Sequence, residues 1–110
     1  MSAVTTVPIT VTPEAAAHVA GLSMQKELQS MIERAQQLIP GLQRLDVVLE
    51  PPYDTGDEMA VVIEALRDLS TYDPEDRTHR EWTAWQIHTF SPDILRHFTL
   101  LVSYGLNHAR

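Results

Sequence analysis

The stretch that decides the fold of this 110-residue chain is residues 45–66, LDVVLEPPYDTGDEMAVVIEAL. Leu45, Val47 and Leu49 alternate with Asp46, Val48 and Glu50 before the central turn, and residues 59–66 alternate in the same way after it. A period of two with β-branched residues is typical of strands. Prolines, Gly56 and acids in the segment between them break regular structure and favour a turn. We therefore predict two paired strands joined by an acidic turn.

The residues before this pair predict a strand and a helix. Val7, Ile9 and Val11 alternate with polar or proline positions, which indicates a third strand. Because Pro8 has no amide donor, this strand either lies at an edge of the sheet or begins at Pro8. Thr12-Pro13-Glu14 is a typical helix start, with a capping hydroxyl followed by proline. An apolar stripe at helical spacing then runs from residue 24 to residue 39. We expect one main helix, kinked or divided at Gly21 and ended by Pro40-Gly41.

Residues 9–19, ITVTPEAAAHV, resemble the opening of the A-type iron–sulfur carrier proteins. That family carries its cluster on three cysteines further along the chain, whereas this chain has no cysteine. We therefore reject membership of that family and predict no cofactor.

Two further helices are predicted after the strand pair. Asp73-Pro74 repeats the cap-then-proline start, and the helix that follows carries Trp82 and Trp85 and ends at Phe90. Ser91-Pro92-Asp93 then begins a second helix, in which five apolar residues share one face: Ile94, Leu95, Phe98, Leu101 and Val102. The predicted order of elements is β-α-β-β-α-α.

These elements predict a single α+β domain over residues 1–110, with a small antiparallel sheet covered by the first and the last helix. The opposite sheet face would carry Val48, Ala60, Val62 and Leu66 among its acids. Because a monomer rarely leaves so much apolar surface and an unpaired strand edge in water, we expect a homodimer, formed through a sheet edge or through helices.

Composition and charge narrow the classes of function. The net charge is −7, and residues 46–76 contain ten acids but one base, Arg67. An acidic segment repels phosphate backbones, so we expect no nucleic-acid binding and consider a basic protein partner instead. No apolar run approaches the length of about 20 residues that spans a bilayer, and we expect no membrane segment. With no cysteine and no visible secretion signal, a cytoplasmic location is expected.

Two groups of polar residues are candidates for chemistry. Asp54, Asp57 and Glu58 in the turn offer oxygen ligands for Mg²⁺ or Ca²⁺, but their spacing is not that of an EF-hand, and a solvated hairpin loop explains them without a metal. His88 and His97 lie on successive predicted helices and could approach each other as a zinc or general-base site. Exposed helix histidines are the simpler interpretation, and we predict no metal site and no catalytic residue.

The function that we expect is a non-catalytic protein–protein interaction or regulatory module, of the antitoxin or inhibitor kind. Its partner would bind the turn acids Asp54, Asp57 and Glu58 or the aromatic pair Trp82 and Trp85. The alternative is a small metal-dependent or histidine-based enzyme, using Asp57, Glu58, His79, His88 or His97.

Overall fold

The computed structural model describes residues 7–51 and 59–105, and these form an α+β fold. The strands are β1 (Ile9–Val11), β2 (Leu42–Glu50), β3 (Ala60–Asp68) and β4 (Phe98–Gly105). The helices are α1 (Pro13–Gly21), α2 (Gln25–Leu38), α3 (Arg77–Thr89) and α4 (Pro92–Leu95), with a short 3-10 turn, η1 (Leu69–Thr71), after β3. None of the described helices is both long enough and apolar enough to cross a bilayer.

The described strands form one mixed sheet in the order β1-β2-β3-β4. β2 and β3 pair antiparallel, as predicted, with Leu45 opposite Ala65 and Val47 opposite Ile63. β1 is parallel to β2, and β4 is parallel to β3. The predicted α+β class is confirmed, but the sheet is mixed rather than antiparallel. Long helical connections link each parallel pair, and such connections allow the chain to return and enter the sheet in the same direction.

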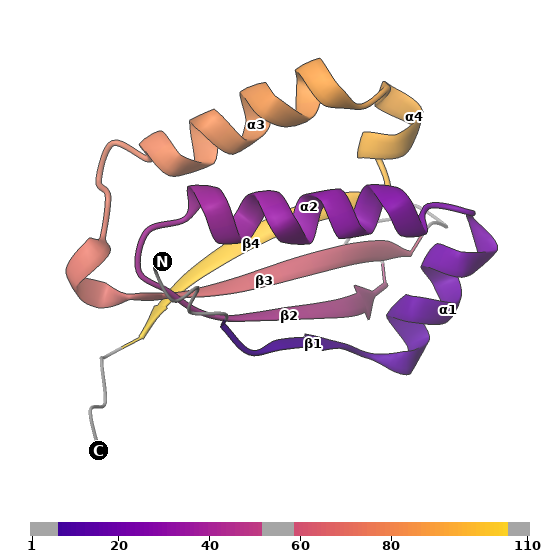
Figure 1. Ribbon diagram of the computed structural model, residues 1–110, viewed down its shortest axis with the longest axis horizontal. Coiled ribbons are helices and arrows are strands. Elements are labelled where there is room, and N and C mark those ends of the chain that lie inside the picture. Colours follow the sequence, from indigo (N-terminus) through magenta and orange to yellow (C-terminus); the bar gives the residue numbers. More distant parts are fainter. Residues whose placement is uncertain (1–6, 52–58, 106–110) are drawn as a thin grey trace, which may run out of the picture.

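Both helical connections cross the same face of the sheet (Figure 1). The β1–β2 pair and the β3–β4 pair run in opposite directions, so the two crossovers have opposite hands. The connection from β1 to β2 is the left-handed one, which departs from the strong preference for right-handed crossovers. Because β1 is only three residues long, it carries little of the strand twist from which that preference arises.

The hydrophobic core lies between the sheet and the layer formed by α2 and α3. Met31 and Ala35 of α2 and Trp82 of α3 are almost fully buried against the inward residues of the strands. These inward residues alternate along each strand: Leu45 and Val47 on β2, Val61, Ile63 and Ala65 on β3, and Phe98 and Leu100 on β4. The predicted covering by helices is confirmed, but α3 occupies the place that was expected for the last helix.

The C-terminal segment differs most from the secondary structure predicted from the sequence. The predicted last helix stops at Leu95, and residues 98–105 form the edge strand β4. The sequence FTLLVSYG also has the alternation and the β-branched and aromatic residues of a strand, so the local pattern is ambiguous. Pairing with β3 decides the outcome, since β4 covers the second edge of β3 along its whole length.

The predicted helix boundaries in the N-terminal half are confirmed. The Thr12 hydroxyl accepts a hydrogen bond from the Ala15 amide at 3.2 Å, and Pro13 is the first helical residue. The helix divides after Gly21, where Ser23 has a φ of 58°. Gly41, with a φ of 69°, turns the chain from α2 into β2.

Candidate functional site

The acids predicted to bind a partner or a cation, Asp54, Asp57 and Glu58, lie outside the described residues. Their role stays a prediction. The two strands that lead into this turn, β2 and β3, are described in full and carry acids of their own.

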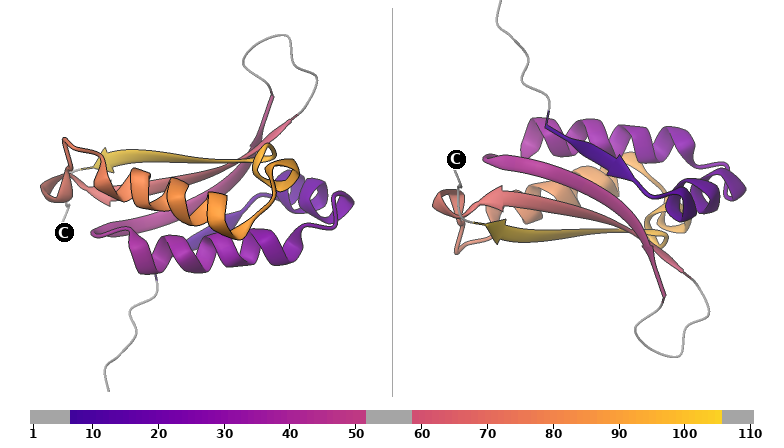
Figure 2. Two further views of the ribbon diagram at one scale, coloured as in Figure 1. Left: turned by 90° about the horizontal axis from the view of Figure 1, so that it is seen from above. Right: turned by 90° about the horizontal axis from the view of Figure 1, so that it is seen from below.

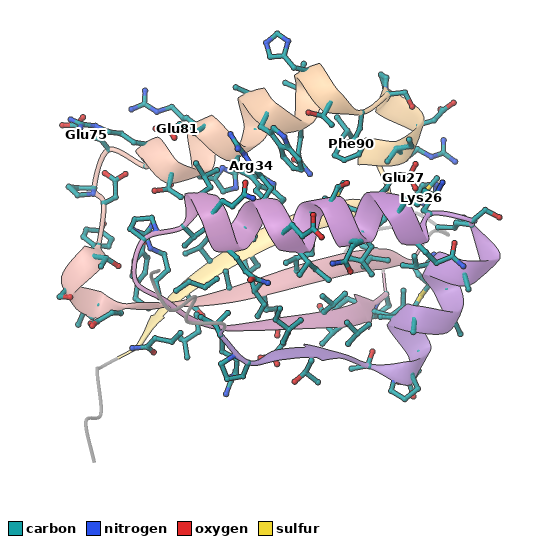
Figure 3. All side chains as sticks on the ribbon, viewed as in Figure 1. Lys26, Glu27, Arg34, Glu75, Glu81 and Phe90 are labelled. Carbon is teal, nitrogen blue, oxygen red and sulfur yellow. The ribbon has the colours of Figure 1, made fainter. Side chains whose placement is uncertain are left out.

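The aromatic pair predicted to bind a partner lies mainly inside the protein. Trp82 is 1% exposed, and its ring centroid lies 5.2 Å from that of Trp85, which in turn packs edge-on against Phe90. The Arg34 guanidinium lies over the Trp85 ring, 5.7 Å from its centroid. Figure 3 shows Arg34 on the side of α2 that faces α3. This cluster joins α2 to α3, and its predicted part in partner binding stays a prediction.

The histidines are not assembled into a metal site within the part of the chain that the structure describes. There, no three His, Asp or Glu side chains gather closely enough to hold an ion. His88 is exposed near the end of α3, whereas His97 is 9% exposed just before β4. Among the described residues the His97 Nδ1 atom has no hydrogen-bond partner.

The side of the sheet that faces away from α2 and α3, which we call the open face, is covered by none of the described helices (Figure 2). The residues that alternate with the core positions of β2, β3 and β4 form it. Its apolar members are Val48, Ala60, Val62, Leu66 and Leu101. Four of these residues were predicted on this face, and Leu101 joins them because residues 98–105 form a strand.

Two carboxylates lie side by side at the centre of the open face. Asp46 of β2 is directly opposite Glu64 of β3 in the antiparallel register. Residues in such positions have Cβ atoms about 4.5–5.5 Å apart, and like charges there destabilise the pair. The Arg44 Nε atom lies 2.7 Å from Asp46 Oδ2 and neutralises one of the two. Within residues 7–51 and 59–105, no cation forms an ion pair with Glu64.

Apolar side chains surround this carboxylate pair on the open face. Val48 lies opposite Val62 on one side of the pair, and Leu101 is the register partner of Glu64 on β4. Val62 is only 5% exposed, whereas Leu101 is 50% exposed. The open face thus combines a net negative centre with an apolar border.

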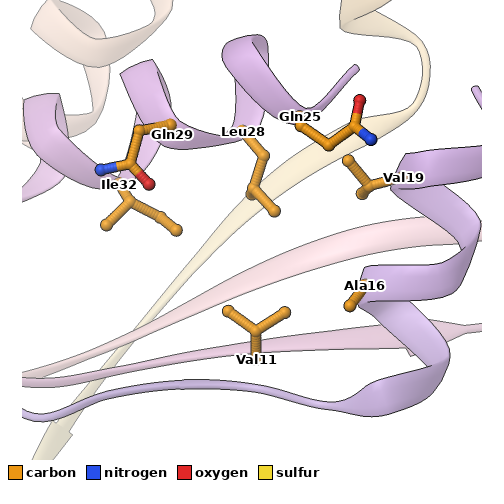
Figure 4. Close-up of a pocket in the computed structure, with 7 residues that line it drawn as sticks. All are labelled: Val11, Ala16, Val19, Gln25, Leu28, Gln29 and Ile32. Atoms are coloured by element: carbon orange, nitrogen blue, oxygen red, sulfur yellow. The ribbon is translucent and has the colours of Figure 1, made fainter. Parts of the chain in front are cut away.

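Hollows elsewhere on the described surface have different chemistry. A groove of about 220 Å³ between β1, α1 and α2 is lined by apolar side chains and by Gln25 and Gln29 (Figure 4). A shallow hollow on α3 is lined by Arg77, Arg80, Glu81 and Ala84. The first contains no titratable group, and the second is an exposed helix surface, so neither brings together a nucleophile and a base.

The Asp46–Glu64 pair was not predicted from the sequence, although both acids were noted. The pair follows from the register of the hairpin: once Glu50 is placed opposite Ala60, Asp46 lies opposite Glu64. The nine residues between these two positions, 51–59, set no single register, so the sequence alone did not fix which acids face each other.

Comparison of the chain with models of protein families, with curated proteins and with solved structures gives no match, so the function has to be argued from the open face and its neighbours.

Proposed function

We propose that this protein is a non-catalytic interaction module whose open face binds a partner segment that carries arginine or lysine among apolar residues. The observation that supports the proposal is Glu64, a half-buried carboxylate opposite a second carboxylate and without a cation among the described residues. The expected class of function, a regulatory or inhibitor-like binder, is unchanged. The proposed binding surface lies on the strands that adjoin the turn instead of on the turn itself.

The two carboxylates of the pair are unevenly neutralised. Like charges on directly opposite residues of an antiparallel pair repel each other. At a separation of about 5 Å this repulsion is of the order of 1 kcal/mol in a water-like environment, and it is larger where water is excluded. Arg44 offsets the charge of Asp46, and its own side chain is 55% exposed. A basic side chain from a partner would offset the remaining charge, so the repulsion in the free protein would become attraction in the complex.

The apolar border supports a protein partner rather than a simple cation. Leu101 is half exposed, and Val48 and Leu66 are partly exposed beside the carboxylates. Burial of apolar area gives about 25 cal/mol per Å², whereas charge pairs at a rim contribute little affinity by themselves. A segment that alternates basic and apolar residues would match both features, and its basic residues would fix the position in which it binds.

Peptide binding tests the proposal directly. The probes are three synthetic ten-residue peptides: one alternating arginine with valine and leucine, one with glutamate in place of arginine, and one of arginine and serine alone. Fluorescence anisotropy at about 150 mM salt measures the affinity of each. We expect the first peptide to bind most tightly, because it alone matches both the charge and the apolar border.

Matched variants identify the surface that binds. Glu64→Gln should weaken the first peptide at least fivefold, whereas Glu81→Gln, an equivalent change on exposed α3, should leave its affinity unchanged. Equal effects of the two substitutions would mean that net charge alone drives binding. Equal binding of all three peptides would contradict the proposal.

A further inference from the structure

The two edge strands of the sheet, β1 and β4, differ in how well they are protected against pairing with a strand of another molecule. β1 is three residues long and follows Pro8, and short strands and prolines are common ways to prevent edge-to-edge pairing. β4 is eight residues long, and its sequence, FTLLVSYG, contains neither a charged residue nor a proline. Its register with β3 is continuous from Phe98 to Gly105, so no bulge bends it away. β4 therefore presents a long, regular and unprotected edge.

The free backbone groups of β4 can be assigned from its pairing with β3. The Val61 amide donates a hydrogen bond to the carbonyl of His97 at 2.9 Å, so the backbone groups of His97 point toward β3. Successive residues of a strand point their backbone groups to opposite sides, so Thr99, Leu101 and Ser103 also face β3. Phe98, Leu100, Val102 and Tyr104 then present their amides and carbonyls to the outer edge. No described residue forms a backbone hydrogen bond with these outward groups, and Figure 2 shows no described helix or strand beside that edge. The Tyr72 ring packs edge-on against Tyr104 at the C-terminal end of β4.

We infer that two copies of this chain pair antiparallel through their β4 strands, around a two-fold axis at Leu101. In this register Leu100 exchanges hydrogen bonds with Val102 of the partner subunit, and Phe98 with Tyr104 of the partner subunit. All four outward residues of each strand are then paired. The eight strands would form one continuous sheet whose outer edges are the two short, protected β1 strands.

The same register matches the side chains on the open face. Leu101, which is 50% exposed in the single chain, would face Leu101 of the partner subunit. Residues paired in this way exchange no hydrogen bonds between the two subunits, and their Cα atoms approach to about 4.5 Å, so the two leucines would pack side by side and remain part of the open face. Thr99 would face Ser103 of the partner subunit, which is a favourable hydroxyl pair. A self-complementary pattern of this kind favours a second copy over an unrelated strand.

Charge does not oppose this association. β4 contains no charged residue, and the carboxylate in register with Leu101, at the proposed two-fold axis, is Glu64 on the neighbouring strand. The two Glu64 strands would be three strand spacings apart, about 14 Å. That distance exceeds the Debye length of about 8 Å at physiological salt, so the repulsion between the two copies is screened there.

Single cysteines provide the sharpest test, because the natural chain has none. Leu101→Cys should form an intermolecular disulfide rapidly under mild oxidation, since the expected Cα separation is compatible with a disulfide. Thr99→Cys alone should not, because the two copies of residue 99 would be four residues apart along the strands, about 13 Å. A mixture of Thr99→Cys and Ser103→Cys should cross-link with each other. A different pattern of cross-links, or none, would overturn the proposed pairing.

Sedimentation velocity over a range of concentrations measures the association without cross-linking. We expect a dimer for the natural chain and a monomer for Val102→Pro, which removes an outward amide that the fold itself does not use. Leu69→Lys, an exposed apolar residue in η1, is the matched control and should still dimerise. A monomer at all concentrations for the natural chain, or a dimer that survives Val102→Pro, would overturn the inference. The Val102 side chain lies on the core side of β4, so Val102→Pro leaves the side chains of the open face in place. Peptide binding to the open face can therefore be measured independently of dimerisation.

Discussion

The Arg67 guanidinium lies 5.3 Å from the ring centroid of Tyr104 and donates from Nη1 to its hydroxyl at 3.3 Å. Arg67 is only 2% exposed, and no carboxylate pairs with it among the described residues. Its Nε atom donates to the Pro40 carbonyl at 3.1 Å and its Nη2 atom to the Thr71 carbonyl at 2.8 Å. One buried side chain therefore joins the end of α2, the turn after β3 and the edge strand β4.

Loss of this arginine should be costly. Arg67→Met would leave two partly buried carbonyls without their donors, and we expect the free energy of unfolding to fall by roughly 2–4 kcal/mol. Tyr104→Phe removes one hydrogen bond and keeps the ring, so it should cost about 1 kcal/mol. Urea denaturation followed by circular dichroism measures both changes. Arg80→Met, on exposed α3, is the control, and an equal loss there would show that Arg67 has no special role.

Two glycines should respond in opposite ways to alanine. A Cβ at Gly41 would lie 2.5 Å from Thr71 Cγ2, and the φ of +69° disfavours any other residue, so Gly41→Ala should destabilise the fold by more than about 1 kcal/mol. Gly21 is the last residue of α1 and has no atom within 4 Å of such a Cβ. Gly21→Ala should therefore stabilise the fold by about 0.5 kcal/mol. Thermal melts of the two variants test the pair, and a shift in the same direction would contradict it.

The carboxylate pair should reduce the stability of the free protein. Glu64→Gln removes the repulsion from Asp46, and we expect the free energy of unfolding to rise by roughly 0.2–1 kcal/mol. Asp46→Asn removes the same repulsion but also the ion pair with Arg44, so its gain should be smaller. Denaturant titration at low and high salt measures the difference, which salt should diminish. A loss of stability in Glu64→Gln would show that the carboxylate has a stabilising contact.

Asp73 should make the start of α3 sensitive to acid. Desolvation raises the pKa of its carboxyl, but hydrogen bonds from the amides of Arg77, Glu75 and Thr78 and the charge of Arg77 outweigh this effect, and the pKa lies below its usual 3.8. A depressed carboxyl pKa stabilises the fold above about pH 4, and that contribution is lost as the pH falls through the lowered value. Asp73→Ala should therefore be less stable than the natural chain at pH 7, with the difference shrinking below pH 4. If the stability difference between the two proteins did not change with pH, the ionised Asp73 carboxylate would not be what stabilises the start of α3.

Metal ions should leave the stability unchanged. An ion that binds only the folded state adds about 2.7 kcal/mol at one hundred times its dissociation constant. Because the acids of the turn do not follow EF-hand spacing, we expect no shift in the melting temperature with millimolar Mg²⁺ or Ca²⁺, or with micromolar Zn²⁺. A specific shift would reopen the enzyme alternative, and substitution of Asp57 or His97 would then locate the site.

The sequence by itself determined the elements whose signals are local. The Thr12-Pro13 cap, the apolar stripe of α2, Gly41 after it and the alternation of β2 and β3 depend on neighbouring residues, and all of them appear in the structure. The choice between helix and strand for residues 98–105 was not local, because their apolar pattern fits both periods and only the free edge of β3 selects the strand. Tertiary structure alone also decided that Asp46 faces Glu64 and that Arg67 is buried. Both depend on strand register and on contacts between residues far apart in the chain, which no local pattern specifies.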